Sequence, residues 1–252
     1  MFRLIRFTFR MVVTLKLMAI AFSAGMGAAY VLQLRAQYRS WGLVDDDRAV
    51  TGDELVPEAD IMETRTIDID AAPDRVWPWL VQLGYGRGGW YSYPLLDRSW
   101  SPGGGPTSNS ADSILEEFQD LAEGDLVPTQ QGSGFVVRML EPGEALVLYL
   151  DDIITREHIE EMVADASEDA EEAIEAIEDM DMPPYKVSWA FVLEDAPGGR
   201  TRLVERLRIG FENLSGGQRR ATPVLSMGVF ALMRSQLLGI KSRAEAATVD
   251  ED

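Results

Sequence analysis

Glu205 is the side chain with the clearest potential for chemistry in this sequence. It lies in the strand-like segment 200–211, where residues two apart share one face of a sheet. The residues that share its face are apolar: Leu203, Leu207, Ile209 and Phe211. A carboxyl among apolar neighbours has a raised pKa and can act as an acid, a base or a ligand anchor. The alternatives are that Glu205 pairs with an arginine or lies near a solvated strand end.

Aromatic residues form a second candidate group. Trp189 and Phe191 fall on the apolar face of the strand-like segment 185–194, and three more aromatics follow the glycine-rich stretch 84–89. Such a loop could act as a lid over a cavity mouth, or its aromatics could fill the gap between loop and sheet. The predicted ligand-binding residues are Trp90, Tyr91, Tyr93, Trp189, Phe191 and Glu205.

Three other polar groups give weaker signals. Tyr149 could offer a hydroxyl to a ligand. It is expected on the same face of its strand as Val147, however, which favours packing in the core. The arginines of the segment 200–211 alternate with its apolar face, and we expect them in water: Arg202, Arg206 and Arg208. The glycine-rich stretch 84–89 is not interpreted as a nucleotide-binding loop. It follows a helix, whereas a dinucleotide-binding loop follows a strand and opens a helix.

The sequence offers little for nucleophilic or metal chemistry. It has no cysteine, and His158 is its one histidine. A catalytic triad would therefore depend on His158, which lies beside Glu157, Glu160 and Glu161 in an acidic run. A divalent-cation site there is the alternative to a solvated acidic face, which we favour. We predict no metal and no cofactor.

The charge balance excludes a polyanion as partner. The chain has 23 basic and 42 acidic residues, for a net charge of −19. Such a surface repels nucleic acid and anionic headgroups, so we expect no nucleic-acid partner. Only three of the basic residues are lysines: Lys16, Lys186 and Lys241. An excess of acidic residues with few lysines is typical of a protein that stays soluble in concentrated salt. The alternative explanation for this composition is a high-GC genome together with one acidic insertion.

The N-terminal region predicts a membrane anchor. Residues 11–34 are almost entirely apolar, and snorkelling of Lys16 extends the uncharged stretch to about the 20 residues that a bilayer requires. Basic residues on its N-terminal side favour a single span with the N-terminus inside and the domain outside. A cleaved signal peptide is the alternative, with a small-residue site at Gly27-Ala28-Ala29.

The rest of the chain predicts an α+β domain. Residues 1–39 are the anchor, 40–60 a linker, 61–247 the domain and 248–252 an acidic tail. The expected strands are 67–69, 125–129, 135–140, 145–150, 185–194 and 200–211, and the expected helices are 72–83, 110–121 and 223–247. Runs of strands flanked by helices are typical of an antiparallel sheet packed on helices. Residues 153–182 form a strongly acidic, amphipathic helical insertion that could dock on a protein partner.

These segments resemble the SRPBCC superfamily (START-like, Bet v1-like), in its polyketide cyclase/dehydrase-like branch. The resemblance rests on the string IDIDAAPDRVWPWLVQLGYGRGGWYSY at 67–93, on SWAFVLE at 188–194, on GGRTRL at 198–203 and on LLGIK at 237–241. It implies a helix-grip fold, in which a curved antiparallel sheet wraps a long C-terminal helix around an apolar cavity. Members of the superfamily use that cavity for lipids, sterols or polyketides, and a minority catalyse cyclisation or dehydration there.

Three functions are compatible with these patterns. The first is a membrane-tethered binding protein for a hydrophobic small molecule, such as a lipid, an isoprenoid or a polyketide. The second is a cyclase or dehydratase that uses Glu205 as acid/base with a tyrosine as partner. The third is a protein-interaction module built on the helix 153–182. We favour the first, because no nucleophile–base pair is evident, and we therefore expect a binding protein rather than an enzyme.

Overall fold

The computed structural model describes residues 32–44, 48–92, 110–130, 133–151 and 183–246. The chain divides into two compact units, Met1–Trp41 and Gly42–Asp252. In the first unit, residues 32–38 are helical and a turn follows them. Several predictions fall outside the described residues: most of the membrane segment 11–34, Tyr93, His158, the acidic helix 153–182 and the tail 248–252.

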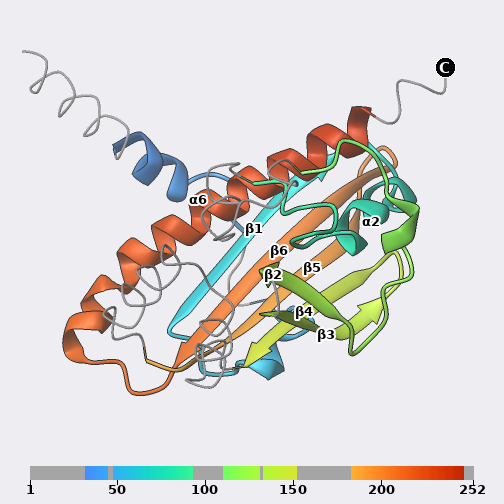
Figure 1. The fold of residues 1–252 in the computed structure, drawn as a ribbon. Coiled ribbons are helices and arrows are strands. Elements are labelled where there is room, and N and C mark those ends of the chain that lie inside the picture. Colours follow the sequence, from blue (N-terminus) through green and yellow to red (C-terminus); the bar gives the residue numbers. More distant parts are fainter. Residues whose placement is uncertain (1–31, 45–47, 93–109, 131–132, 152–182, 247–252) are drawn as a thin grey trace, which may run out of the picture. The chain divides into compact units, whose positions relative to one another are not determined.

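The second unit is built on one antiparallel sheet of six strands, in the order β1-β6-β5-β4-β3-β2 (Figure 1). The strands are β1 (Ile61–Ile69), β2 (Leu126–Gln130), β3 (Ser133–Glu141), β4 (Ala145–Asp151), β5 (Tyr185–Ala196) and β6 (Arg200–Phe211). Each strand from β2 to β5 pairs with the next strand along the chain, and β1 pairs with the last strand, β6. The predicted antiparallel sheet is confirmed, and β6 has the predicted bounds.

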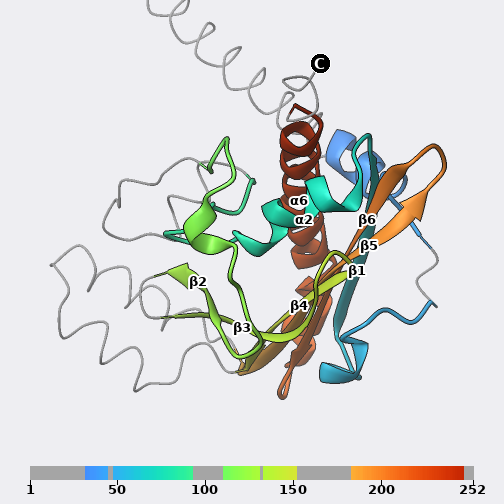
Figure 2. The ribbon, with the colours of Figure 1, turned by 90° about the vertical axis from the view of Figure 1, so that its right-hand side faces the viewer.

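A long C-terminal helix, α6 (Gly216–Ala246), lies along one face of this sheet, and α2 (Pro73–Val81) packs against this helix and against strands β5 and β6 (Figures 1 and 2). We call the face toward α6 the inner face. The helix buries an apolar row against it: Phe230, Met233, Leu237, Ile240 and Ala244. Each fully buried side chain of this size contributes about 2 kcal/mol. This α+β arrangement is consistent with a helix-grip-like fold.

The helix α6 begins seven residues before the predicted start at Pro223, which lies inside it. Its N-terminus is set by a capping box, because Ser215 N donates to Gln218 Oε1 (2.8 Å) and Gln218 N to Ser215 Oγ (3.3 Å). Among the described residues, α6 is long and apolar enough to cross a membrane by length and composition alone. A third (33%) of the stretch that meets this test is buried inside the protein.

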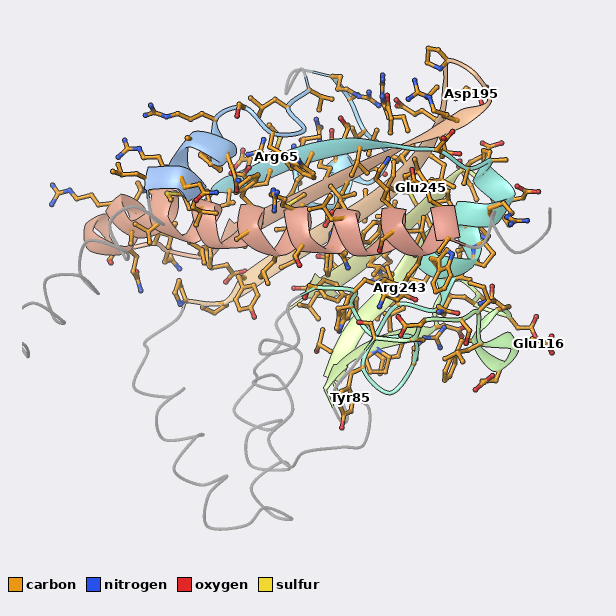
Figure 3. All side chains as sticks on the ribbon, turned by 90° about the horizontal axis from the view of Figure 1, so that it is seen from above. Arg65, Tyr85, Glu116, Asp195, Arg243 and Glu245 are labelled. Atoms are coloured by element: carbon orange, nitrogen blue, oxygen red, sulfur yellow. The ribbon has the colours of Figure 1, made fainter. Side chains whose placement is uncertain are left out.

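Ion pairs and hydrogen bonds hold the C-terminal end of α6 to the end of β1. Lys241 Nζ donates to the carbonyl oxygen of Asp68 at 2.5 Å and pairs with Glu245 at 2.7 Å. Glu245, labelled near the end of the helix in Figure 3, accepts the backbone N–H of Asp70 at 2.7 Å. These contacts fix the position of the helix along the inner face.

The predicted helix 110–121 is wrong. The structure has only one 3-10 turn there, η2 (Glu116–Phe118). Side chains of the α2 region bind this segment and replace helical hydrogen bonds. Gln82 Oε1 accepts the N–H of Leu115 at 2.9 Å, and Arg87 Nη2 donates to the carbonyl oxygen of Phe118 at 3.3 Å. The segment is therefore an extended cover over α2 rather than a helix.

The prediction that Arg206 lies in water is also wrong, because residues 48–57 cover the outer face of the sheet. The side chain of Arg206 is 2% exposed and pairs with Asp53 at 2.6 Å. It also donates to Thr64 Oγ1 at 3.0 Å and to the carbonyl oxygen of Arg48 at 3.0 Å. Arg208 is mostly covered by the same segment, whereas Arg202 stays half-exposed beside Asp68. The segment 48–57, part of the predicted linker, is thus bound to the sheet.

A small apolar core supports this covering segment. Val50 packs on Val147 and Ala190, which point to the outer face from β4 and β5. Gly52 approaches the sheet most closely, with a φ of +92° and with Ser188 Oγ donating to its carbonyl oxygen at 2.8 Å. The outer face is therefore covered by polypeptide here, which leaves the inner face as the place for a site.

Candidate functional site

The carboxyl group of Glu205 is fully buried on the inner face, in the middle of β6. Its side chain is 0% exposed, and its Oε1 accepts a hydrogen bond from Trp189 Nε1 at 2.9 Å. Its Oε2 is buried and has no hydrogen-bond partner among the described residues. Burial raises the pKa of Glu205 to about 8, and the Trp189 hydrogen bond opposes this shift only in part. The predicted inward direction of Glu205 is confirmed.

The neighbouring arginine does not neutralise this carboxyl. Arg65 on β1 lies directly opposite Glu205 in the strand register. Its Nη2 instead pairs with Glu63 at 2.9 Å, and its guanidinium lies 4.8 Å from the ring centroid of Phe230 on α6. Both members of this ion pair are almost fully buried. The charge of Arg65 is thus satisfied by Glu63, which leaves the acid form of Glu205 favoured.

Four aromatic side chains surround the hydrogen bond between Trp189 and Glu205. Trp90 and Trp189 stack with their ring centroids 5.2 Å apart and their planes 10° from parallel. Phe135 meets both rings edge-on, at 6.2 and 5.4 Å. Phe191, opposite Glu205 in the register of β5 and β6, lies 5.2 Å from Trp189. Both tryptophans are half-buried, so the cluster leads from the carboxyl toward the surface.

The helix side contributes a second polar group without a partner. Gln236 on α6 is 2% exposed, and neither its Nε2 nor its Oε1 has a hydrogen-bond partner among the described residues. It belongs to the buried row of α6, together with Met233 and Leu237. Native proteins pair the great majority of their buried polar atoms, so each exception requires an explanation. Glu205 Oε2 is such an exception on the sheet, and Gln236 is one on the helix that covers its inner face.

Tyr91 has a structural environment of its own. Its hydroxyl accepts a hydrogen bond from Gln82 Nε2 at 2.7 Å, and its ring meets Trp79 of α2 edge-on at 5.9 Å. The guanidinium of Arg243 lies over the other part of the ring, 5.0 Å from its centroid. Burial raises the pKa of Tyr91 to about 12. Tyr91 therefore joins α2 to α6 through its contacts with Gln82, Trp79 and Arg243.

The glycine-rich loop before Trp90 is tied down at both ends. Gly84 and Gly89 form an isolated antiparallel bridge, and Gly88 N donates to the carbonyl oxygen of Gln82 at 2.7 Å. Arg87 donates to the carbonyl oxygens of Val81, the last residue of α2, and of Leu83 just beyond it. These bonds hold the Trp90 backbone at a fixed position beside the sheet.

No tyrosine within the described residues reaches Glu205 as a proton-transfer partner. Tyr91 is bonded to Gln82, and Tyr149 points to the outer face, where its hydroxyl donates to Asp151 at 3.2 Å. The expectation that Tyr149 packs in the core is confirmed, since it is 9% exposed. The part of the chain that the structure describes also contains no group of three His, Cys, Asp or Glu side chains able to hold a metal ion.

The structure thus brings together four of the six predicted ligand-binding residues: Trp90, Trp189, Phe191 and Glu205. Tyr91 lies apart, and Tyr93 is outside the described residues. Sequence reasoning missed Phe135 and Gln236. The helical spacing of the α6 row, at 230, 233, 237, 240 and 244, places 236 on the same side and could have revealed Gln236. No local signal could have paired Phe135 with the tryptophans.

Comparisons with known proteins found similar solved structures but no matching family model and no matching curated protein. Among solved structures, it is similar to a hypothetical protein of Helicobacter pylori (10% identity, TM-score 0.41, 81% of this chain and 99% of that one). It is also similar to a protein of Mesorhizobium loti (15% identity, TM-score 0.34, 76% and 99%). A third is DynU16, a protein in the dynemicin biosynthetic locus (12% identity, TM-score 0.34, 70% and 45%).

Proposed function

We propose that this protein binds a hydrophobic small molecule between the inner face of the sheet and α6. The observation that carries the proposal is the buried Oε2 of Glu205, which has no hydrogen-bond partner among the residues that the structure describes. The other carboxyl oxygen is bonded to Trp189, which stacks on Trp90. The apolar walls would hold the body of the molecule, and Glu205 and Gln236 would contact its polar atoms. The segment 11–34, a predicted membrane span, would tether the domain where apolar molecules are most abundant.

The energetics of burial support this proposal. A buried polar group that lacks a partner costs about 1–3 kcal/mol. Such groups lie on both layers, at Glu205 on the sheet and at Gln236 on α6. A ligand that supplies hydrogen-bond partners to these atoms would recover that free energy. Binding sites for small molecules commonly combine apolar walls with a few convergent polar groups.

The resemblance to the SRPBCC superfamily points in the same direction, because its members use the space between sheet and helix for apolar ligands. The ligand would belong to the lipid, isoprenoid or polyketide classes. The role of the helix 153–182 as a docking site for a protein stays a prediction from the sequence.

Native mass spectrometry of the full-length chain, released from detergent, tests this function. We expect an apolar molecule to be retained by the wild type and lost from Trp90→Ala. Phe211→Ala is the matched control, because Phe211 packs on Tyr185 at the far end of the same sheet face, about 20 Å from Glu205 along β6. If the wild type retains no molecule and binds no added N-phenyl-1-naphthylamine, the proposal is wrong.

One observation favours an enzyme as the second candidate. A carboxyl with a pKa near 8 can donate and accept a proton at neutral pH, as cyclisation and dehydration require. No tyrosine in the described part of the chain is hydrogen-bonded to Glu205, so in this proposal the proton is exchanged with the substrate itself. In this case Glu205→Gln should retain the bound molecule but lose its conversion in a single-turnover assay. Unchanged turnover in Glu205→Gln would exclude Glu205 as the acid or base.

A further inference from the structure

We propose that Glu205 is a hydrogen-bond donor that selects ligands with a neutral oxygen acceptor, such as a ketone or quinone carbonyl, attached to a flat apolar body. This inference rests on the proposed function and specifies the chemical class of its ligand. It predicts a preference for uncharged carbonyl compounds over both hydrocarbons and organic cations.

The geometry of the carboxyl gives the first argument. Trp189 Nε1 donates to Oε1 at 2.9 Å, so Oε1 is used as an acceptor. In the acid form, the proton is therefore most stable on Oε2, which is buried and has no hydrogen-bond partner within the described part of the chain. A buried O–H group requires an acceptor, and a carbonyl oxygen of the ligand provides one. The burial that raises the pKa of Glu205 keeps this proton in place at neutral pH.

The charges around Glu205 argue against a cationic ligand. On β1, Arg65 and Glu63 pair with each other and leave no net charge for a ligand to balance. The inner-face residues of β5 beside Glu205 are the uncharged Trp189 and Phe191, and α6 carries a half-buried arginine, Arg234. A bound cation would require Glu205 to ionise and would lie beside the buried Arg65, which is opposite Glu205 in the strand register. A neutral acceptor requires neither change.

The arrangement of the aromatic rings gives the preference for a flat ligand. Trp90 and Trp189 stack on each other, so they do not form the two walls of a slot for a cation. Phe135 and Phe191 meet Trp189 at an angle. Together the four rings form one continuous aromatic wall, which favours a conjugated ring or a rigid polycycle laid against it.

Two fluorescent probes test the inference on the full-length chain in amphipol. Prodan has a naphthalene body with a propionyl carbonyl, and N-phenyl-1-naphthylamine has a similar body without one. Energy transfer from protein tryptophan reports the protein-bound fraction of each. At pH 6.5 we expect Glu205→Leu to weaken prodan binding about 5-fold, the equivalent of one neutral hydrogen bond, and to leave N-phenyl-1-naphthylamine binding unchanged.

The pH profile gives a second test that needs no variant. Between pH 6.5 and 9.5, Glu205 loses its proton. Prodan affinity of the wild type should fall at least 5-fold over this range, with its bound emission shifting to the blue as the hydrogen bond is lost. Glu205→Gln keeps an N–H donor and should show a flat profile.

The outcomes separate this inference from the proposed function. Equal responses of both probes to pH and to substitution, or tighter binding of a trimethylammonium analogue than of prodan, would overturn the donor role while leaving apolar binding intact. If neither probe binds the wild type, the proposed function fails and the inference fails with it.

Discussion

The substitution Glu205→Gln should stabilise the protein, and the gain should grow with pH. The side-chain amide is nearly isosteric with the carboxyl, and its oxygen can accept the hydrogen bond of Trp189 Nε1. It differs in having no ionised form. In the wild type, folding must suppress the ionisation of Glu205, because burial raises its pKa from an ordinary value of 4.5 to about 8. The variant removes that cost.

The sign and size follow from proton linkage. Between pH 4.5 and pH 8 the folded state holds the Glu205 proton and the unfolded state does not, so the free energy of unfolding falls as pH rises. The slope is about 1.4 kcal/mol per pH unit. The cost of Glu205 is therefore about 1.4 kcal/mol at pH 5.5 and about 4 kcal/mol at pH 8. The difference in the free energy of unfolding between Glu205→Gln and the wild type should therefore increase by about 3 kcal/mol from pH 5.5 to pH 8.

Urea unfolding of both proteins, followed by near-ultraviolet circular dichroism, measures this difference at the two pH values. All other titrating groups are common to both chains and cancel in the comparison. Glu117→Gln, a substitution of an exposed glutamate in η2, is the control and should follow the wild type within about 0.5 kcal/mol. If the stabilities of Glu205→Gln and the wild type differ by the same amount at pH 5.5 and 8, the buried carboxyl is not protonated in the folded state and the reasoning is wrong.

Two further predictions concern the segment that covers the outer face. Gly52→Ala should cost about 1–3 kcal/mol in urea unfolding, because an added Cβ would lie 2.6 Å from Val147 Cγ1 and φ is +92°. Gly143→Ala, at a φ of +77° with open space around it, should cost less, and equal losses would contradict the close approach. Arg206→Leu should cost about 3–5 kcal/mol because it leaves Asp53 without its closest cation. A loss below 1 kcal/mol would show that this pair behaves like a surface ion pair.

The sequence allowed the strands and their faces to be predicted wherever the period-2 pattern was clear. β6 alternates apolar and polar residues along its length, so both its bounds and the inward direction of Glu205 could be read from it. The same alternation led to the wrong prediction for Arg206. The polar face of a strand is exposed to solvent only if no other segment of the chain covers it. The cover, residues 48–57, lies about 150 positions earlier in the chain, and no local pattern reveals it.

The site illustrates the same limit. Trp189 and Glu205 were each predicted to point inward, but their hydrogen bond depends on the register between β5 and β6, which pairs Phe191 with Glu205 and brings Trp189 alongside. Tyr91 looked equivalent to Trp90 in the sequence. The left-handed φ of +54° at Tyr91 sends the two neighbouring side chains in different directions, one to α2 and one to the sheet. Sequence alone does not specify such a backbone reversal at a residue other than glycine.

Glu205 carries a stability cost that the proposed ligand-binding role would explain. A glutamine at this position would satisfy Trp189 equally well and would remove a pH-dependent cost, and a leucine would remove the buried polar atoms altogether. Residues that weaken a fold while a simpler alternative exists concentrate at functional sites. The stability and probe experiments therefore address one proton: the pH at which Glu205 ceases to destabilise further should coincide with the pH at which carbonyl binding is lost. Agreement of the two midpoints would tie the burial of Glu205 to its role as a donor, which neither experiment can do alone.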